Sequence, residues 1–174
     1  RTMLDQCRVA IGDDPRVTIA QGDLDSPLPV DPNSIDAIMS VAALHWLSDH
    51  KNVWRNFFTA LKPGGRLATD AGGFGNLERT LNLALKLFPE TNFPSWYYAN
   101  VEDTTSLLIE AGFTNCEVEL RPHPTVLPSY ETLVTYLQTL VFRDWPLTQI
   151  ETLAKAMTDN TLDYVRLEVR ATKP

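Results

Sequence analysis

The pattern of apolar and polar positions is most informative between Ile35 and Ala71. Ile35 to Val41 is a short apolar run of the kind buried on both faces of a parallel sheet. From Val53 to Leu61 the apolar residues fall on one stripe of a helix, which Ser48 or Asp49 can cap. This part of the chain therefore predicts a buried strand followed by an amphipathic helix.

The end of that helix is marked by Pro63-Gly64-Gly65, after which Arg66 to Thr69 resumes an extended run. Two parallel strands joined by a crossover helix are the simplest interpretation. The loop from Ser40 to Trp46 then lies at the carboxyl edge of the sheet, where open α/β sheets bind ligands. We therefore expect the chemistry of the protein in this loop.

The remaining elements are predicted from the same kind of spacing. Apolar residues at helical spacing predict a helix already under way at the start of the chain, with Met3, Leu4, Cys7 and Ala10 on its inner face. Further helices are expected over 77–88, 102–111, 130–141 and 147–157, and strands over 16–20, 115–121 and 164–171. The last two strands alternate in polarity, which favours antiparallel partners toward one edge of the sheet.

Composition limits the class of protein. A chain of 174 residues that is 44% hydrophobic can bury one substantial core, so we expect a single domain over 1–174, with 74–100 and 122–160 as candidate substrate-side segments. The net charge of -7 argues against nucleic-acid binding, which needs clustered Lys and Arg. No apolar run approaches the roughly 18–20 residues that span a bilayer, so no membrane partner is expected.

The two cysteines, Cys7 and Cys116, are far apart and lack the spacing of metal ligands. We expect two reduced thiols in a cytoplasmic protein, and no metal site.

Several short motifs, in their order and spacing, resemble the class I S-adenosylmethionine-dependent methyltransferases. Within that family the resemblance is to the small-molecule branch that includes trans-aconitate methyltransferase. The matching residues are Gln21-Gly22-Asp23-Leu24, Ile35 to Ser40 with Ala43 to Leu47, Leu61-Lys62-Pro63-Gly64-Gly65-Arg66-Leu67, Gly72 to Asn76, Leu108 to Phe113, and Val165 to Pro174.

The resemblance implies a Rossmann-like α/β/α fold with sheet order 3-2-1-4-5-7-6 and an antiparallel seventh strand. Residues 16–20 would be strand 3 and Ile35 to Ser40 strand 4. Residues 66–70, 115–121 and 164–171 would be strands 5, 6 and 7.

Strands 1 and 2 of that plan, with the glycine-rich turn that approaches the cofactor, have no counterpart in this sequence. An open sheet centre would leave backbone groups unpaired, at about 1–3 kcal/mol each if they are buried. We therefore expect the native protein to carry the missing segment upstream of Arg1. The alternative is a closed-up sheet in which strand 3 pairs directly with strand 4.

The resemblance also implies a cofactor site for S-adenosylmethionine. Asp23 would accept a hydrogen bond from the adenine amino group while the Leu24 N–H donates to a ring nitrogen; the alternative for Asp23 is an Asx turn. Small side chains at the end of strand 4 would let the cofactor approach closely, or would merely pack there. These residues are Ser40, Val41 and Ala42.

Two residues of the same loop are candidates for the acceptor side. His45 can act as a base or as a hydrogen-bond donor to a carboxylate, and is our candidate catalytic residue; a structural hydrogen bond is the alternative. Trp46 can form an apolar wall for a substrate or can pack against the following helix.

Four further residues are candidate substrate contacts. Asn76 and Arg79 follow a glycine cluster, and an arginine there would suit bidentate recognition of a carboxylate, unless it lies on a solvated helix face. Trp96 and Tyr97 could form a lid, or belong to an exposed loop anchored by one aromatic side chain.

Together these features favour methyl transfer from S-adenosylmethionine to a small metabolite, with a carboxylate as one candidate acceptor. A non-catalytic methyltransferase-like module that acts through protein contacts is the alternative. A nicotinamide-dependent oxidoreductase is disfavoured because the sequence has no G-x-G-x-x-G. The oligomeric state is left open, a homodimer included.

Overall fold

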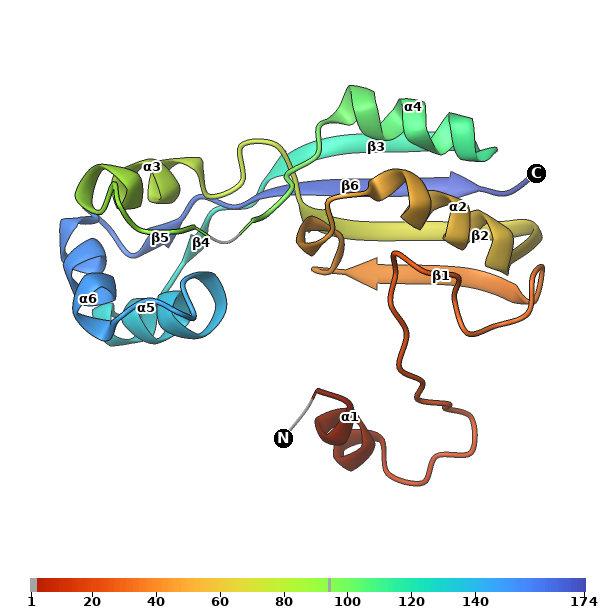
Figure 1. Ribbon diagram of the computed structural model, residues 1–174, viewed down its shortest axis with the longest axis horizontal. Coiled ribbons are helices and arrows are strands. Elements are labelled where there is room, and N and C mark those ends of the chain that lie inside the picture. Colours follow the sequence, from red (N-terminus) through yellow and green to blue (C-terminus); the bar gives the residue numbers. More distant parts are fainter. Residues whose placement is uncertain (1–2, 94) are drawn as a thin grey trace.

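The computed structural model describes residues 3–93 and 95–174. Figure 1 shows a sheet with two helices on one face, a group of helices beyond one end of its strands, and an N-terminal helix apart from both. The large sheet and the helical group are joined by several crossings of the chain.

Four strands form the main sheet, in the order β1-β2-β6-β3. β1 and β2 are parallel, whereas β6 is antiparallel to both of its neighbours, β2 and β3. β1, β2, β6 and β3 thus correspond to strands 4, 5, 7 and 6 of the predicted sheet, and the strand predicted to be antiparallel, strand 7, is β6. The strands are β1 (Ile35–Val41), β2 (Leu61–Gly72), β3 (Thr114–Pro122) and β6 (Val165–Thr172).

β2 begins five residues earlier than the extended run that the sequence predicts. It follows the preceding helix at once, and the glycine turn lies inside the strand as an irregularity, where the β1–β2 register shifts between Ile35 and Ala37. Gly64 has φ +78, a conformation that glycine adopts without steric cost. Its N–H donates to the Lys173 carbonyl over 2.8 Å, so pairing with the end of β6 holds the turn in the sheet.

Helices α2 (His50–Ala60) and α4 (Val101–Ala111) cover one face of this sheet (Figure 1). The Asp49 side chain caps α2 by accepting from the Asn52 N–H, as predicted. The inward faces of these helices and of β2 and β6 form what we call the sheet core. Its most deeply buried members are Val53, Trp54, Phe57, Leu61, Leu67, Leu108 and Val169.

In the part of the chain that the structure describes, the opposite face of the sheet carries exposed side chains. Met39 and Val41 of β1 point to this face and are 80% and 58% exposed. β1 is also one of the two edge strands of the sheet among the described residues. The carboxyl end of β1 is therefore accessible both from its side and from this face.

A second group of buried residues, which we call the helical core, lies beyond the carboxyl ends of β1 and β2. It is rich in aromatic residues; the Phe142 and Trp145 rings stack at 4.4 Å. The elements around it are α3 (Glu78–Leu87), β4 (Thr125–Val126), α5 (Tyr130–Tyr136), the π-helical segment η2 (Leu137–Val141), α6 (Leu147–Ala156) and β5 (Thr161–Leu162).

The N-terminal region differs most from the prediction. α1 (Met3–Ile11) is a helix, but none of its residues is buried. Residues 16–20, predicted as strand 3, are not a strand, and so they do not pair with β1 in a closed-up sheet. The β-branched run indicated a strand, but a strand needs a neighbour to satisfy its backbone, and within the described residues none lies beside it.

Candidate active site

A cavity of about 480 Å³ lies where the carboxyl ends of β1 and β2 meet the helical core. Both parts of the molecule contribute to its wall. From the sheet side come Ala42, His45, Trp46, Asp70, Arg166 and Glu168, and from the other side His123, Thr125, Tyr136, Leu140 and Tyr164.

The chain leaves β1 for the cavity through a sharp turn at Ala42. This residue has φ +55, which is unusual for a residue with a side chain. Its N–H donates to the Asp70 carbonyl over 2.7 Å, which extends the β1–β2 pairing by one bond. The turn directs the short 3₁₀ helix η1 (Leu44–Trp46) across the edge of the sheet.

His45 is held by the main chain on two sides. Its Nδ1 accepts a hydrogen bond from the Gly72 N–H at 3.2 Å, and its carbonyl accepts from the Tyr97 N–H at 3.0 Å. Because a backbone N–H can only donate, Nδ1 is the unprotonated nitrogen and the hydrogen of the neutral ring is on Nε2. The imidazole therefore presents a donor at Nε2.

The charge state of His45 follows from its surroundings. Burial lowers its pKa to about 4, and the nearby charges of Arg166 and His50 add to the effect. The ring is neutral near pH 7. It therefore acts there as a neutral hydrogen-bonding group.

Arg166 supplies the guanidinium of the cavity. Its Nε donates to Asp70 Oδ1 over 2.6 Å and its Nη2 to the Asp70 carbonyl over 3.3 Å. The Arg166 side chain is 18% exposed, so solvent screens this ion pair less than a surface pair. The two bonds fix the plane of the guanidinium and leave further N–H groups for a ligand.

Two tyrosines form the opposite wall. The Tyr164 hydroxyl donates to the Tyr136 hydroxyl over 3.1 Å. Burial and this hydrogen bond raise the pKa of Tyr164 well above its usual value, so the group stays protonated. The pair joins α5 to the segment that leads into β6.

The predicted cofactor residues lie in two places. Ala42 lines the cavity, and Ser40 and Val41 line a smaller hollow of about 250 Å³ on the open face of the sheet, which shares Asp70 and Glu168 with the cavity. Asp23 and Leu24 belong to the irregular segment before β1. Asp23 Oδ1 accepts from the Asp25 N–H in an Asx turn, and the Leu24 carbonyl accepts from the Asn56 side chain.

The predicted aromatic contacts gather around η1. Trp46 lines the cavity, is 51% exposed, and makes an edge-to-face contact with Trp96 at 6.0 Å. Tyr97 instead packs against the His50 ring at 4.9 Å. Trp96 thus lies beside one cavity wall, while Tyr97 faces the start of α2.

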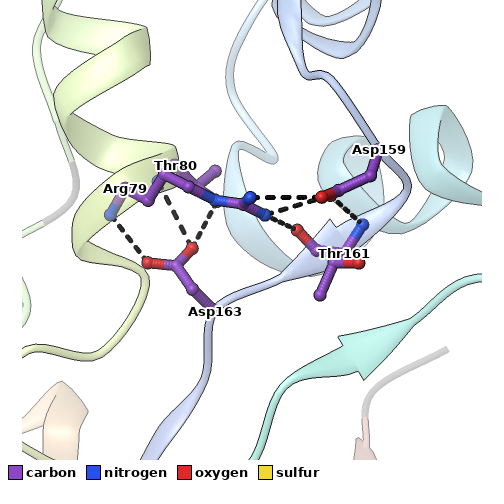
Figure 2. Close-up of polar contacts among 5 residues, drawn as sticks. All are labelled: Arg79, Thr80, Asp159, Thr161 and Asp163. Carbon is purple, nitrogen blue, oxygen red and sulfur yellow. Dashed lines mark hydrogen bonds and ion pairs between the residues drawn. The ribbon is translucent and has the colours of Figure 1, made fainter.

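Asn76 and Arg79 do not line the cavity. Asn76 is buried and its Oδ1 accepts from the Val165 N–H. Figure 2 shows the Arg79 guanidinium bound to the carboxylate of Asp159 and the carbonyl of Thr161. The Arg79 side chain therefore fastens α3 to the strand β5.

Several cavity residues had no prediction attached to them. Arg166, Glu168 and Tyr164 belong to the alternating run near the C-terminus, where alternation indicated a strand and not a site. Tyr136 fell on a predicted helix without a signal of its own. The clearest missed clue was Arg166, an arginine on the last strand beside the predicted ligand edge.

Comparison with known sequences finds similarity to methyltransferases. Residues 1–69 match a sequence profile described as a methyltransferase domain. An uncharacterized methyltransferase of Schizosaccharomyces pombe is 33% identical over 106 residues, which is 54% of this chain and 41% of the yeast protein. The chain thus spans less than half the length of this curated relative.

Solved structures show the fold. YcgJ of Bacillus subtilis has a TM-score of 0.66 at 16% identity, covering 97% of this chain and 76% of its own. Phosphoethanolamine N-methyltransferase 2 of Haemonchus contortus, solved with S-adenosyl-L-methionine, has a TM-score of 0.59 at 21% identity, covering 96% and 39%. The chain shares the Rossmann-like fold of these two structures, the second of which is a methyltransferase bound to S-adenosyl-L-methionine.

Proposed function

We propose that the protein transfers a methyl group from S-adenosylmethionine to a small metabolite held in the cavity. The observation that carries this proposal is the position of the cavity at the carboxyl ends of β1 and β2, lined by the predicted residues Ala42, His45 and Trp46. Ligands of open α/β sheets bind at this edge. The match of residues 1–69 to a methyltransferase profile supports the same reaction.

The cofactor is proposed to approach along the end of β1, where Val41 and Ala42 are exposed. Ser40 beside them and Asp23 with Leu24 in the preceding segment are the candidates for holding its nucleoside part. When bound, S-adenosylmethionine supplies a methyl group on a positively charged sulfur. The residues of the chain then have to hold the acceptor in line with that methyl group.

A carboxylate is the acceptor that we propose, in keeping with the small-molecule branch that the sequence resembles. Such a group is ionised near pH 7, so it needs donors and a cation more than a base. Arg166 faces the cavity and can fill the role that the sequence suggested for Arg79. Trp46 and Trp96 would provide the apolar side of the acceptor pocket.

A small-molecule partner and a cytoplasmic location belong to the same proposal. The absence of a nucleic-acid partner, also proposed, is supported by the net charge of -7. Among the described residues, no helix has the length and apolar character needed to cross a membrane.

Calorimetric titration with S-adenosylhomocysteine tests the proposal. We expect saturable binding, and we expect Asp23→Ala to weaken it by about 1–3 kcal/mol, the range for losing a hydrogen bond to a buried polar group. The matched control is Asp25→Ala, two residues along the same exposed segment, which should change little. Absence of binding by the protein would contradict the proposal and favour the non-catalytic alternative. Equal effects of both substitutions would remove Asp23 from the site.

A further inference from the structure

We propose that the methyl acceptor is a monocarboxylate, held between His45 and Arg166, and that the cavity disfavours acids with two or three carboxylates. This inference rests on the proposed methyl transfer in the same cavity. It goes further because it assigns the two residues that bind the acceptor and the charge that the acceptor carries.

His45 is fixed as a donor. The Gly72 N–H occupies Nδ1, so the ring can offer only the Nε2 hydrogen to a ligand. A base would need a free lone pair at Nε2, which this hydrogen bond prevents. Such a donor suits an oxygen that is already ionised, and the acceptor therefore needs no proton removed before it attacks the methyl group.

Arg166 is the only lysine or arginine that lines the cavity among residues 3–93 and 95–174. Its guanidinium is shared with Asp70, which takes the Nε hydrogen and one Nη2 hydrogen. Of the five N–H groups of a guanidinium, those that remain match one further carboxylate. The cavity thus offers a cationic anchor for one anionic group.

A second carboxylate would meet a row of negative charges. Glu168 lies directly opposite Asp70 on one side and Glu119 on the other, across three adjacent strands. Like charges in such positions repel each other. Arg166 pairs with Asp70, Arg121 with Glu119, and Arg170, the next arginine on this face of β6, lies 3.9 Å from Glu117, so three guanidinium groups face four carboxylates.

Glu168 is the least compensated member of this row. Its contact with a cation is 3.6 Å long, to Arg121 Nε, and its side chain is 26% exposed at the cavity wall. Another carboxylate of a ligand would raise the repulsion there. Among the remaining wall residues, Trp46 and Leu140 are apolar and suit an uncharged acid body; His123, Thr125 and the tyrosine pair supply neutral polar groups beside them.

The test is calorimetric titration, with and without S-adenosylhomocysteine, of monocarboxylates (benzoate, cinnamate, hexanoate) and polycarboxylates (succinate, trans-aconitate). We expect the best monocarboxylate to bind at least about 10-fold more tightly than either polycarboxylate. Arg166→Met should abolish carboxylate binding, and Arg166→Lys should weaken it, because an ammonium lacks the planar fork. Cofactor binding should persist in both variants.

The discrimination itself should depend on Glu168. Glu168→Gln should reduce the preference for monocarboxylates to about 3-fold or less, whereas Glu117→Gln should not change it. Glu117 is the matched control because it lies on the neighbouring strand β3, is 75% exposed and does not line the cavity. A polycarboxylate that binds as tightly as the monocarboxylates overturns the inference, and so does a protein that binds none of these acids. Failure of the unmodified protein to bind S-adenosylhomocysteine would instead contradict the proposed function.

Discussion

The sheet core and the helical core build opposite walls of one cavity by different means. On the sheet side, the Gly72 N–H holds the His45 ring, and the carboxylate and carbonyl of Asp70 hold the Arg166 guanidinium, so backbone groups of β2 take part in both contacts. The helical core positions Tyr136 through a hydroxyl contact between side chains. The comparison indicates that the sheet side holds the two residues proposed to bind the acceptor, while side chains on the helical side can change without altering their contacts.

The largest expected effects come from removing one buried leucine side chain from each core. Leu67→Ala in β2 and Leu153→Ala in α6 each remove a buried side chain and should lower the free energy of unfolding by about 2–5 kcal/mol, measured by urea denaturation. Leu153→Ala should leave S-adenosylhomocysteine binding intact under folding conditions, whereas Leu67→Ala should weaken it. If Leu153→Ala weakens S-adenosylhomocysteine binding as much as Leu67→Ala does, the assignment of cofactor binding to the sheet side is wrong.

A smaller effect concerns the N-terminus of α3. The Asp163 carboxylate accepts from the N–H groups of Arg79 and Thr80 and from the Thr80 hydroxyl (Figure 2). Asp163→Ala should cost about 1–3 kcal/mol of unfolding free energy, since it leaves these donors without their acceptor.

The neighbouring Asp159 provides the control for that experiment. Its ion pair with Arg79 is about half exposed on both sides and is screened by solvent, so Asp159→Ala should cost clearly less than Asp163→Ala. Chemical denaturation of both variants gives the ranking. An Asp159→Ala effect as large as that of Asp163→Ala would show that the ion pair, and not the cap, fastens α3.

His45 predicts a pH dependence of stability on the sheet side. Its folded pKa of about 4 lies below the ordinary value of 6.5, so the unfolded chain binds the extra proton between these values. The contribution of His45 to the free energy of unfolding is therefore fully present above about pH 6.5 and is lost as the pH falls toward 4. We expect His45 to account for about 1–2 kcal/mol of this loss, after allowing for its partial exposure.

Unfolding free energies of the protein and of His45→Gln at pH 7 and pH 4.5 measure this contribution. Arg166 and His50 are the charged and titratable neighbours that lower the pKa of His45, and both stay in place in the variant. His50 also titrates at a lowered pKa, so the difference between the two proteins is the relevant quantity. An identical pH dependence in both proteins would contradict the assignment.

The smallest expected effect is at the turn after β1. Ala42→Gly should raise the unfolding free energy by a few tenths to about 1 kcal/mol, because glycine adopts φ +55 without the steric cost of a side chain. Ala43→Gly is the matched control: Ala43 has φ -112, so the change should destabilise instead. Thermal unfolding distinguishes the two signs.

The sheet could be predicted from the sequence to a large extent. The apolar run over Ile35 to Val41 and the alternation near the C-terminus both became strands in the expected order, because strand period and burial are local signals. The prediction of a strand over 16–20 was wrong because a strand also requires a neighbouring strand, which a local sequence pattern cannot reveal.

Only the part of the site that lies at the carboxyl edge of the sheet could be predicted from the sequence. Ala42, His45 and Trp46 reach the cavity as expected, since strand direction determines where that loop lies. Arg166 and Tyr136 approach it from segments more than 60 residues away in the chain, so only tertiary packing brings them together. Arg79 was expected near the pocket mouth, but Asp159 and Thr161 bind its side chain instead.

The junction between the two cores is set at Gly73. Its N–H donates to the Val165 carbonyl, and a Cβ added there would collide with the side chains of Leu120 and Leu167. Packing this close excludes any residue larger than glycine at position 73 without a shift of its neighbours. Variants selected for new acids would therefore keep Gly73 and change the pocket wall through Tyr136 and Leu140, one side chain at a time.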